Sequence, residues 1–324
     1  MTYAIQIHAH GGPDVMQWQK IDVPNPGPGE ARIKQTCVGL NFIDVYQRKG
    51  IYPLSLPTSI GMEAVGIVEA VGSDVSEVIP GDRVAYVMGP PGSYAEARLY
   101  PASRLIKLPE DISDQQAAAM MLKGLTASYL IHKTFKVQKG QKVLVHAAAG
   151  GVGLILCQWL DRLGVEVIGT VGSPEKEALA RQYGCHHVIR YNEEDFAEAV
   201  LSLTHGEGVP VVYDGVGASV YEQSLACLAR FGCYANFGAA SGAVPPVPGS
   251  ALAAKALYYT RPGLAAHTAT PTLTNDIAQP LFDAVRQGIK IEINQTFPLK
   301  DAAHAHAALE GRKTTGSTIL TVEA

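Results

Sequence analysis

The stretch that decides the fold is residues 142–164, KVLVHAAAGGVGLILCQWLDRLG. An apolar run, KVLVHAA, leads directly into AGGVG and then into a helical pattern that ends at Gly164. Glycine permits a tight turn and close backbone approach, and the N–H groups at the helix N-terminus attract a pyrophosphate. The spacing of Ala147, Gly150 and Gly153 inside a β-α-β unit therefore predicts a nucleotide-binding loop rather than a purely structural turn.

The segments that follow continue the same alternation of strand and helix. The runs VEVIGTV, HHVIRY, PVVYDGVG and GCYANFG are apolar without polar alternation, which is typical of strands buried on both faces. Between the first two, Ser173 and Pro174 occupy cap and first-turn positions of a helix that ends at Gly184. The pattern predicts a doubly wound parallel sheet covered by helices.

The first hundred residues have a different texture. Proline and glycine clusters such as PNPGPGE and GPPG separate short β-branched runs, which predicts short strands and tight turns in a partly open barrel. After residue 264 the strand pattern returns. We therefore expect an α/β protein with a β-rich domain over 1–122, completed by 264–324, and a nucleotide-binding domain over 123–263.

Composition and charge exclude several classes of protein. The net charge is −4 without a basic run, so nucleic acid is not an expected partner. No apolar stretch approaches the roughly 20 residues of a membrane helix, and the N-terminus lacks a signal-peptide pattern. Five cysteines without a CxxC motif suit a reducing cytoplasm.

The cofactor preference follows from the end of the second strand of the nucleotide unit. An NAD site usually carries an acid there, which binds the ribose 2′-hydroxyl. Here the corresponding position is Ser173, followed by Lys176, and Tyr191 closes the third strand. A hydroxyl, an ammonium and a phenol favour the 2′-phosphate of NADPH over NADH, although Glu175 places an acid beside them.

Longer motifs identify a family resemblance over essentially the whole chain. GLNFIDVYQRKGIYP at 39–53, GMEAVGIVEAVG at 61–72, HAAAGGVG at 146–153 and NFGAASG at 236–242 occur in order. Together they resemble the NADPH:quinone oxidoreductases, the zeta-crystallin-like, zinc-free branch of the medium-chain dehydrogenase/reductase superfamily, and bacterial members in particular. The resemblance implies a GroES-like catalytic domain, a Rossmann domain, a cleft between them and a homodimer formed through the Rossmann sheets.

The resemblance also implies roles for individual residues. The catalytic candidates are Asn41, Tyr46 and Tyr52, of which the two tyrosines would line the quinone pocket. Asp44 would point toward the cofactor. The residues expected to bind NADPH are Asn41, Phe42, Ile43, Asp44, Tyr46, Tyr129, Gly150, Gly151, Val152, Gly153, Gly172, Ser173, Lys176, Tyr191, Phe237, Gly238, Ala239, Ala240 and Arg312.

Zinc is not expected. Zinc-dependent relatives carry a cysteine at the position of Asn41 and the histidine of a Gly-His-Glu triplet at the position of Met62. An amide and a thioether are poor replacements for thiolate and imidazole around zinc. Glu63, which follows Met62, is then a structural residue that pairs with a nearby base rather than a general acid.

The expected chemistry is hydride transfer from the nicotinamide C4 carbon to a quinone, with Tyr52 or Asn41 donating a hydrogen bond to the developing oxyanion. Quinones are electrophilic enough to react without a Lewis acid. Two alternatives stay open at this point. One is an NADPH-dependent reductase of α,β-unsaturated ketones or aldehydes, and the other is a non-enzymatic NADPH-sensing or RNA-binding protein.

Overall fold

The computed structural model describes residues 2–322 as two compact units. The first unit contains the residues up to Lys123, His267–Asp276 and the residues from Ile291 onward. The second contains Gly124–Ala266 and Ile277–Lys290. Helices α2 (Asp114–Tyr129) and α9 (Pro271–Arg286) each contribute residues to both units.

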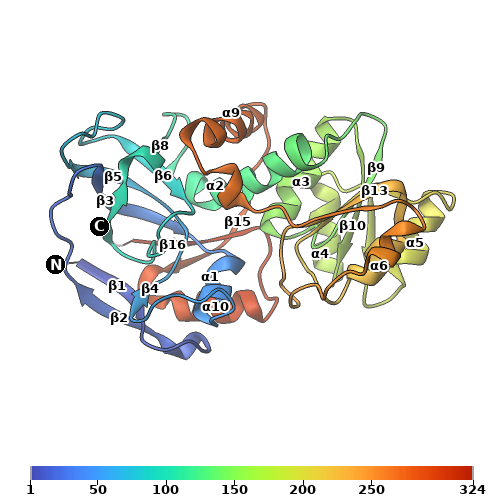
Figure 1. Cartoon of the computed structure of the whole chain (residues 1–324), viewed down its shortest axis with the longest axis horizontal. Helices are drawn as coiled ribbons and strands as arrows, with labels where there is room; N and C mark the ends of the chain where they lie inside the picture. The colour runs from blue at the N-terminus through green and yellow to red at the C-terminus, as the bar shows by residue number, and fades with distance from the viewer. Residues whose placement is uncertain (1, 323–324) are drawn as a thin grey trace. The chain divides into compact units, whose positions relative to one another are not determined.

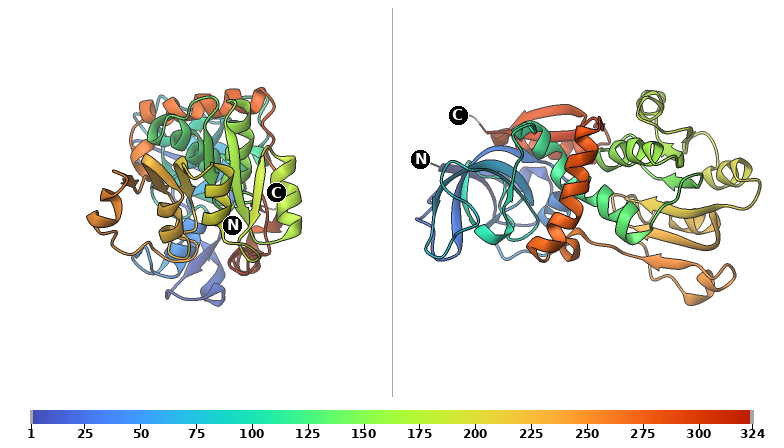
Figure 2. Two further views of the ribbon diagram at one scale, coloured as in Figure 1. Left: turned by 90° about the vertical axis from the view of Figure 1, so that its right-hand side faces the viewer. Right: turned by 90° about the horizontal axis from the view of Figure 1, so that it is seen from above.

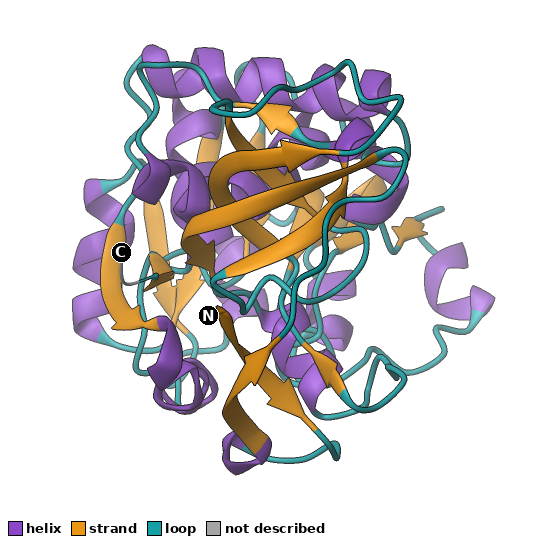
Figure 3. Ribbon diagram, turned by 90° about the vertical axis from the view of Figure 1, so that its left-hand side faces the viewer, coloured by secondary structure: helices purple, strands orange, loops and turns teal. Residues whose placement is uncertain are grey.

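The first unit is rich in strands, which lie edge to edge in a curved sheet (Figures 1 and 3). Its larger sheet has seven strands in the order β15-β16-β3-β5-β6-β8, with β7 also paired to β3, and a smaller sheet has the order β2-β1-β4. The strands are β1 (Thr2–Ile7), β2 (Met16–Ile21), β3 (Glu30–Gly39), β4 (Thr58–Ser59), β5 (Glu63–Val71), β6 (Arg83–Val87), β7 (Ala97–Pro101), β8 (Ile106–Lys107), β15 (Ile293–Pro298) and β16 (Ser317–Thr321). Its own helices are α1 (Phe42–Arg48) and α10 (Ala302–Glu310).

The C-terminal segment is part of the core of this unit. Leu299, Ala305 and Leu320 pack in the same buried cluster as Ile5 and Tyr86. Strand β16 pairs with β3, with Ile319 opposite Gly39, two residues before the N-cap of α1.

The second unit is built on a six-stranded sheet in the order β11-β10-β9-β12-β13-β14, in which every strand pair is parallel. Val143, Leu144 and Val145 are consecutive and all fully buried, so both faces of the sheet are covered (Figure 2). The strands are β9 (Lys142–Val145), β10 (Glu166–Val171), β11 (His187–Arg190), β12 (Val209–Asp214), β13 (Leu228–Asn236) and β14 (Tyr258–Thr260). The helices are α3 (Gly151–Arg162), α4 (Pro174–Gln182), α5 (Phe196–Leu203), α6 (Tyr221–Ala226), α7 (Gly249–Ala253) and α8 (Leu264–His267), the last of which ends just past the unit.

The predicted helix boundaries have local causes that the structure confirms. Ser173 accepts a hydrogen bond from the Lys176 backbone N–H at 3.3 Å, with Pro174 at the first helical position of α4. Gly164 and Gly184 follow α3 and α4 with φ of 71° and 87°, the left-handed conformation that ends helices.

The tail differs from the sequence-based boundary, which placed all of 264–324 with the first domain. Residues Ile277–Lys290 belong instead to the second unit. Leu281 of α9 packs so closely against Gly124 that an added Cβ would lie 2.5 Å from its methyl group. The Gln158 side chain also donates to Lys290 O at 3.0 Å and accepts from Lys290 N at 2.9 Å.

The architecture confirms the predicted fold class, an α/β protein with a β-rich unit and a doubly wound parallel-sheet unit. Within residues 2–322, the helices are too short or too polar to cross a bilayer.

Candidate active site

The glycine loop of the second unit has the geometry of a phosphate cradle. Between β9 and α3, Ala147 adopts a φ of 52°, and its carbonyl accepts a hydrogen bond from Gly150 N at 2.9 Å. A Cβ added at Gly153 would lie 2.3 Å from that same carbonyl oxygen, so only glycine fits there. Among the described residues no side chain caps the N-terminus of α3, which leaves its first N–H groups available to an anion.

A second cluster lies where β10 and β11 end. A Cβ at Gly172 would lie 2.5 Å from the Tyr191 hydroxyl, so these two predicted residues are neighbours. Ser173 and Lys176 are joined through the α4 cap. The Ser173 hydroxyl also hydrogen-bonds to the Glu175 carboxyl and lowers its pKa. The Ser173 hydroxyl therefore already has one acceptor in this corner.

Sequence reasoning missed Asp214, at the end of β12. Its buried carboxylate accepts hydrogen bonds from Val216 N at 2.6 Å, Gly217 N at 3.1 Å, the Tyr234 hydroxyl at 2.5 Å and Asn236 Nδ2 at 2.9 Å. The signal was present as an acid followed by glycine in YDGVG. Asp214 fixes the 214–217 turn and the end of β13, where the predicted residues Phe237, Gly238, Ala239 and Ala240 begin.

In the first unit, Asn41 forms the N-cap of α1. Its backbone N–H donates to Asp44 Oδ2 at 2.9 Å. Its amide nitrogen donates to Glu63 Oε2 at 2.7 Å and to Gly39 O at 3.4 Å, and the residue is buried. The amide nitrogen therefore has acceptors inside the unit, and the role of Asn41 as a donor to an oxyanion stays a prediction.

Asp44 lies in the interior of the first unit, and its orientation toward the cofactor stays a prediction. Oδ2 accepts from Asn41 N and from the Tyr94 hydroxyl at 3.0 Å. Oδ1 is buried without a hydrogen-bond partner among the described residues. Burial raises the pKa of Asp44 to about 7, against the opposing effect of these two donors.

Glu63 has the structural role predicted for it. Oε1 accepts from Leu122 N at 2.6 Å, and Lys123 Nζ lies 3.9 Å from Oε2. Lys123 Nζ also donates to Leu40 O at 3.1 Å. Burial raises the pKa of Glu63 and lowers that of Lys123, while each partially offsets the shift of the other.

The predicted quinone-site tyrosines form an aromatic pair. The rings of Tyr46 and Tyr52 meet edge to face, with centroids 5.5 Å apart and an interplanar angle of 82°. Tyr46 is 8% exposed and also contacts Phe42, whereas Tyr52 is 40% exposed. Tyr52 is therefore the member of the pair that a ligand could reach, with Tyr46 as its support.

The other predicted cofactor residues are distributed over both units. Gly151 and Val152 open α3, and Ile43 is a partly buried residue of α1. Tyr129 ends α2 in the second unit and is buried, which raises the pKa of its hydroxyl. Arg312 lies in the first unit, in an exposed turn after α10 with a φ of 57°.

The positions that bind zinc in relatives hold internal contacts here. Met62 is buried, and its sulfur accepts a hydrogen bond from Gln47 Nε2 at 3.0 Å. Over the described range, no cluster of three or more His, Cys, Asp or Glu residues could hold a metal ion.

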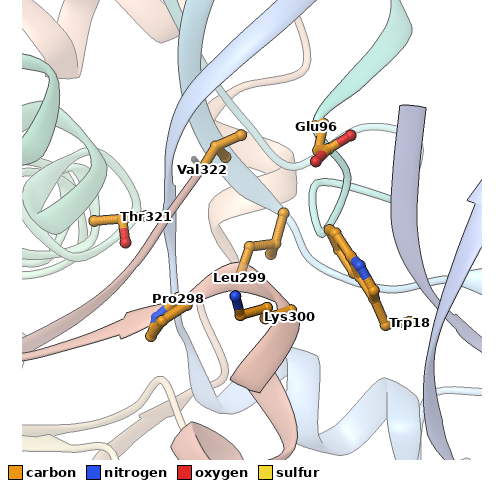
Figure 4. A pocket seen from close by; sticks show the side chains of 7 residues that line it. All are labelled: Trp18, Glu96, Pro298, Leu299, Lys300, Thr321 and Val322. Carbon is orange, nitrogen blue, oxygen red and sulfur yellow. The ribbon is translucent and has the colours of Figure 1, made fainter. Parts of the chain in front are cut away.

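The small pocket in Figure 4 is too small for a quinone, because its volume of about 20 Å³ admits about one water molecule. It is lined by Trp18, Glu96, Pro298, Leu299, Lys300, Thr321 and Val322.

Comparisons with known proteins find relatives over the whole chain. Residues 27–110 match the family model "Alcohol dehydrogenase GroES-like domain", and residues 151–274 match "Zinc-binding dehydrogenase". The quinone oxidoreductase of Pseudomonas aeruginosa is 49% identical over 99% of both chains. The 2-haloacrylate reductase of a Burkholderia species is 44% identical over the full length of both. The crystal structure of Escherichia coli quinone oxidoreductase complexed with NADPH has a TM-score of 0.96, 43% identity, and coverage of 99% of this chain and 100% of that one.

Proposed function

Because the chain belongs to the quinone oxidoreductase family of the medium-chain dehydrogenase/reductases, we propose that it reduces quinones with NADPH and without zinc. The chain is an oxidoreductase of that family. We propose its acceptor, its independence of zinc and the residues of its site. The observation that carries the proposal is the occupation of both zinc-ligand positions by internally bonded side chains. The amide of Asn41 is held by Glu63, and the sulfur of Met62 is held by Gln47.

The glycine loop and the β10–β11 corner fit NADPH. The tight turn that Gly153 allows beside the Ala147 carbonyl and the uncapped start of α3 suit the pyrophosphate, while Ser173, Lys176 and Tyr191 suit a 2′-phosphate. We assign the remaining cofactor contacts to the residues named from the family resemblance. When bound, NADPH supplies a hydride from its C4 carbon.

The protein's own contribution is to hold the acceptor and stabilise the oxyanion. Tyr52 is the more exposed residue of the aromatic pair, so we assign it the donor role, with Tyr46 as the wall behind it. The backbone of residues 41–46 would orient the nicotinamide end of the cofactor. Without a Lewis acid the site suits an acceptor that is already electrophilic, and water supplies the proton.

We further propose a homodimer that forms through β14. This strand is at the edge of the parallel sheet, and Tyr258 on β14 and Phe231 near it are exposed by 64% and 67%. The five buried free thiols suit a reducing compartment, so we place the protein in the cytoplasm. Analytical sedimentation of the wild type and of Tyr258→Asp tests this proposal. We expect the wild type to sediment as a dimer and the variant as a monomer.

A second candidate activity has a specific observation in its favour. The full-length 44% identity to a 2-haloacrylate reductase indicates that this scaffold also accommodates reduction of an activated alkene. Alkene reduction would use the same cofactor and fold, so only the acceptor distinguishes the two activities.

The test is a panel of acceptors assayed with NADPH and NADH in parallel. We expect higher kcat/KM for 1,4-benzoquinone and 9,10-phenanthrenequinone than for 2-alkenals or 2-chloroacrylate. The same enzyme dialysed against a chelator should keep its rate. Alkene reduction without quinone reduction would assign the second activity instead, and a rate that zinc restores after dialysis would exclude the metal-free proposal.

A further inference from the structure

In the first unit, a line of hydrogen bonds connects the two ends of α1. It runs from Arg48, at the end of the helix, through His306 of α10 and Tyr94 to Asp44, in its first turn. Arg48 contacts His306 Nδ1 at 3.0 Å, and His306 Nε2 contacts the Tyr94 hydroxyl at 2.9 Å. Tyr94 donates to Asp44 Oδ2 at 3.0 Å, and Asn41 N donates to the same oxygen at 2.9 Å. Asp44, Arg48, Tyr94 and His306 are all fully buried.

The donor chemistry gives this line one direction. A guanidinium can only donate, so Nδ1 of His306 must accept and therefore carries no proton. The neutral ring then carries its proton on Nε2 and donates it to the Tyr94 oxygen. The Tyr94 hydrogen is left to point at Asp44. Burial and the Arg48 charge hold the pKa of His306 at about 3, which keeps the ring neutral at physiological pH.

The outer end of the line is anchored by charge. Arg48 forms an ion pair with Glu310 at 2.6 Å, and Glu310 also pairs with Lys49 at 2.5 Å. Arg48 Nε donates to Gly11 O at 3.1 Å. A buried arginine with these acceptors cannot rotate away cheaply, so the donor sequence Arg48, His306, Tyr94, Asp44 is fixed.

We propose that Tyr94 and His306 are positioning residues for the reaction, which hold Asp44 as a carboxylate and thereby fix residues 41–46 for turnover. This inference rests on the proposed function, because residues 41–46 are the segment we assign to the nicotinamide end and the acceptor. Asp44 accepts a hydrogen bond from the backbone N–H of Asn41, the N-cap residue of α1. Tyr46 follows Asp44 in the same helix.

We call the hydrogen bonds from Tyr94 and Asn41 to the Asp44 carboxylate the clamp. The charged groups around Asp44 set the pH range in which the clamp holds. Burial and Glu63 of β5 raise the pKa of Asp44, while the Asn41 N–H, Tyr94 and Lys123 of α2 lower it. His306 of α10 reaches Asp44 through Tyr94, and Arg48 of α1 reaches it through His306 and Tyr94. With a pKa of about 7, Asp44 loses its charge as the pH falls through that value, and the clamp weakens.

The experiment compares Tyr94→Phe with Tyr100→Phe, a matched control in the same unit whose hydroxyl bonds to Met88 O. It also compares His306→Leu with His306→Gln, which retains a donor toward Tyr94, and with His304→Gln, an exposed position on α10. NADPH-binding stoichiometry gives the number of folded sites, and kcat with 9,10-phenanthrenequinone is expressed per site. ¹⁵N NMR of the wild type reports the His306 tautomer.

We expect Tyr94→Phe and His306→Leu to lower kcat per site about tenfold, as small misplacements of reacting groups do. The acid limb of kcat/KM should move to higher pH in Tyr94→Phe, because a donor to the carboxylate is lost. His306→Gln should recover most of the rate, and both controls should behave as wild type. The NMR spectrum should show a neutral ring with the proton on Nε2 from pH 5 to 8.

Unchanged kcat per site and an unmoved acid limb in Tyr94→Phe would overturn the inference, as would a protonated or Nδ1–H ring. If the wild type reduces no quinone, the proposed function fails on its own. The tautomer then still tests the hydrogen-bond line, and the pH dependence of NADPH binding in Tyr94→Phe and Tyr100→Phe still tests the clamp.

Discussion

Two buried carboxylates, one in each unit, stand at the predicted binding segments and differ in how they are satisfied. Asp214 of the second unit accepts hydrogen bonds from two backbone N–H groups, a phenol and an amide. Asp44 of the first unit has two donors on one oxygen, and the other oxygen is buried without a partner in the described part of the chain.

The two carboxylates therefore differ in how many donors hold each oxygen. A buried carboxylate whose two oxygens both accept several hydrogen bonds holds the surrounding backbone in place. Burial with few hydrogen-bond donors raises the pKa of a carboxyl group toward neutral pH. We therefore expect the second unit to hold its predicted binding loop by backbone geometry. In the first unit we expect the charge of Asp44 to change with pH.

The largest effect that this comparison predicts is on stability. Asp214→Asn replaces an acceptor with a group that must present hydrogens to existing donors, and we expect a loss of about 3 kcal/mol in the free energy of unfolding. Asp44→Asn should cost less than about 1 kcal/mol, since fewer donors face that carboxyl and its Oδ1 has no hydrogen-bond partner among the described residues. Urea unfolding followed by circular dichroism measures both, and equal losses would remove the distinction.

The glycine loop offers a second, smaller test of backbone geometry. A Cβ at Gly153 would lie 2.3 Å from a backbone oxygen, and the nearest atom to a Cβ at Gly150 would be 3.2 Å away. Gly153→Ala should destabilise the protein by about 2 kcal/mol through this overlap, with a much smaller loss for Gly150→Ala. Similar unfolding midpoints for the two variants would show that the loop relaxes.

A third prediction concerns the charge at the 2′-phosphate corner. Lys176→Ala should raise KM for NADPH about tenfold, equivalent to about 1.4 kcal/mol, with little change for NADH. Arg181→Ala on the same helix, which pairs with Glu177, is the matched control. Steady-state rates measured against NADPH and NADH concentration in parallel give the two KM values. An equal rise of both KM values in Lys176→Ala would place Lys176 outside the 2′-phosphate site.

The smallest predicted effect is a pH dependence of stability. His306 has a pKa of about 3 in the folded protein and an ordinary value of 6.5 when unfolded, so the unfolded chain binds the extra proton below pH 6.5. Its contribution is fully present above 6.5 and is lost as the pH falls toward 3. His306→Gln lacks this linkage, so its stability deficit should shrink by about 1 kcal/mol between pH 7.5 and 5.5. A deficit that is independent of pH would contradict the buried neutral ring.

The sequence predicted what depends on local spacing. The glycine loop, the Ser173 cap and the alternation of strand and helix are read within a few tens of residues, and all are present in the structure. The line through Asp44, Tyr94 and His306 was out of reach, because Tyr94 and His306 are 212 residues apart and His306 and Arg48 are 258 apart. The contact between Asn41 and Glu63 was likewise out of reach, because Glu63 lies 22 residues further along the chain, on β5.

The most direct test of the account is a single-turnover measurement with metal-depleted enzyme. NADPH carrying deuterium at the transferred C4 position is mixed with 9,10-phenanthrenequinone in a stopped-flow instrument, and cofactor oxidation is followed by absorbance. We predict rapid oxidation that slows with deuterium and does not change on adding zinc. Oxidation that requires zinc, or a complete absence of quinone-dependent oxidation, would contradict zinc-independent hydride transfer to a quinone.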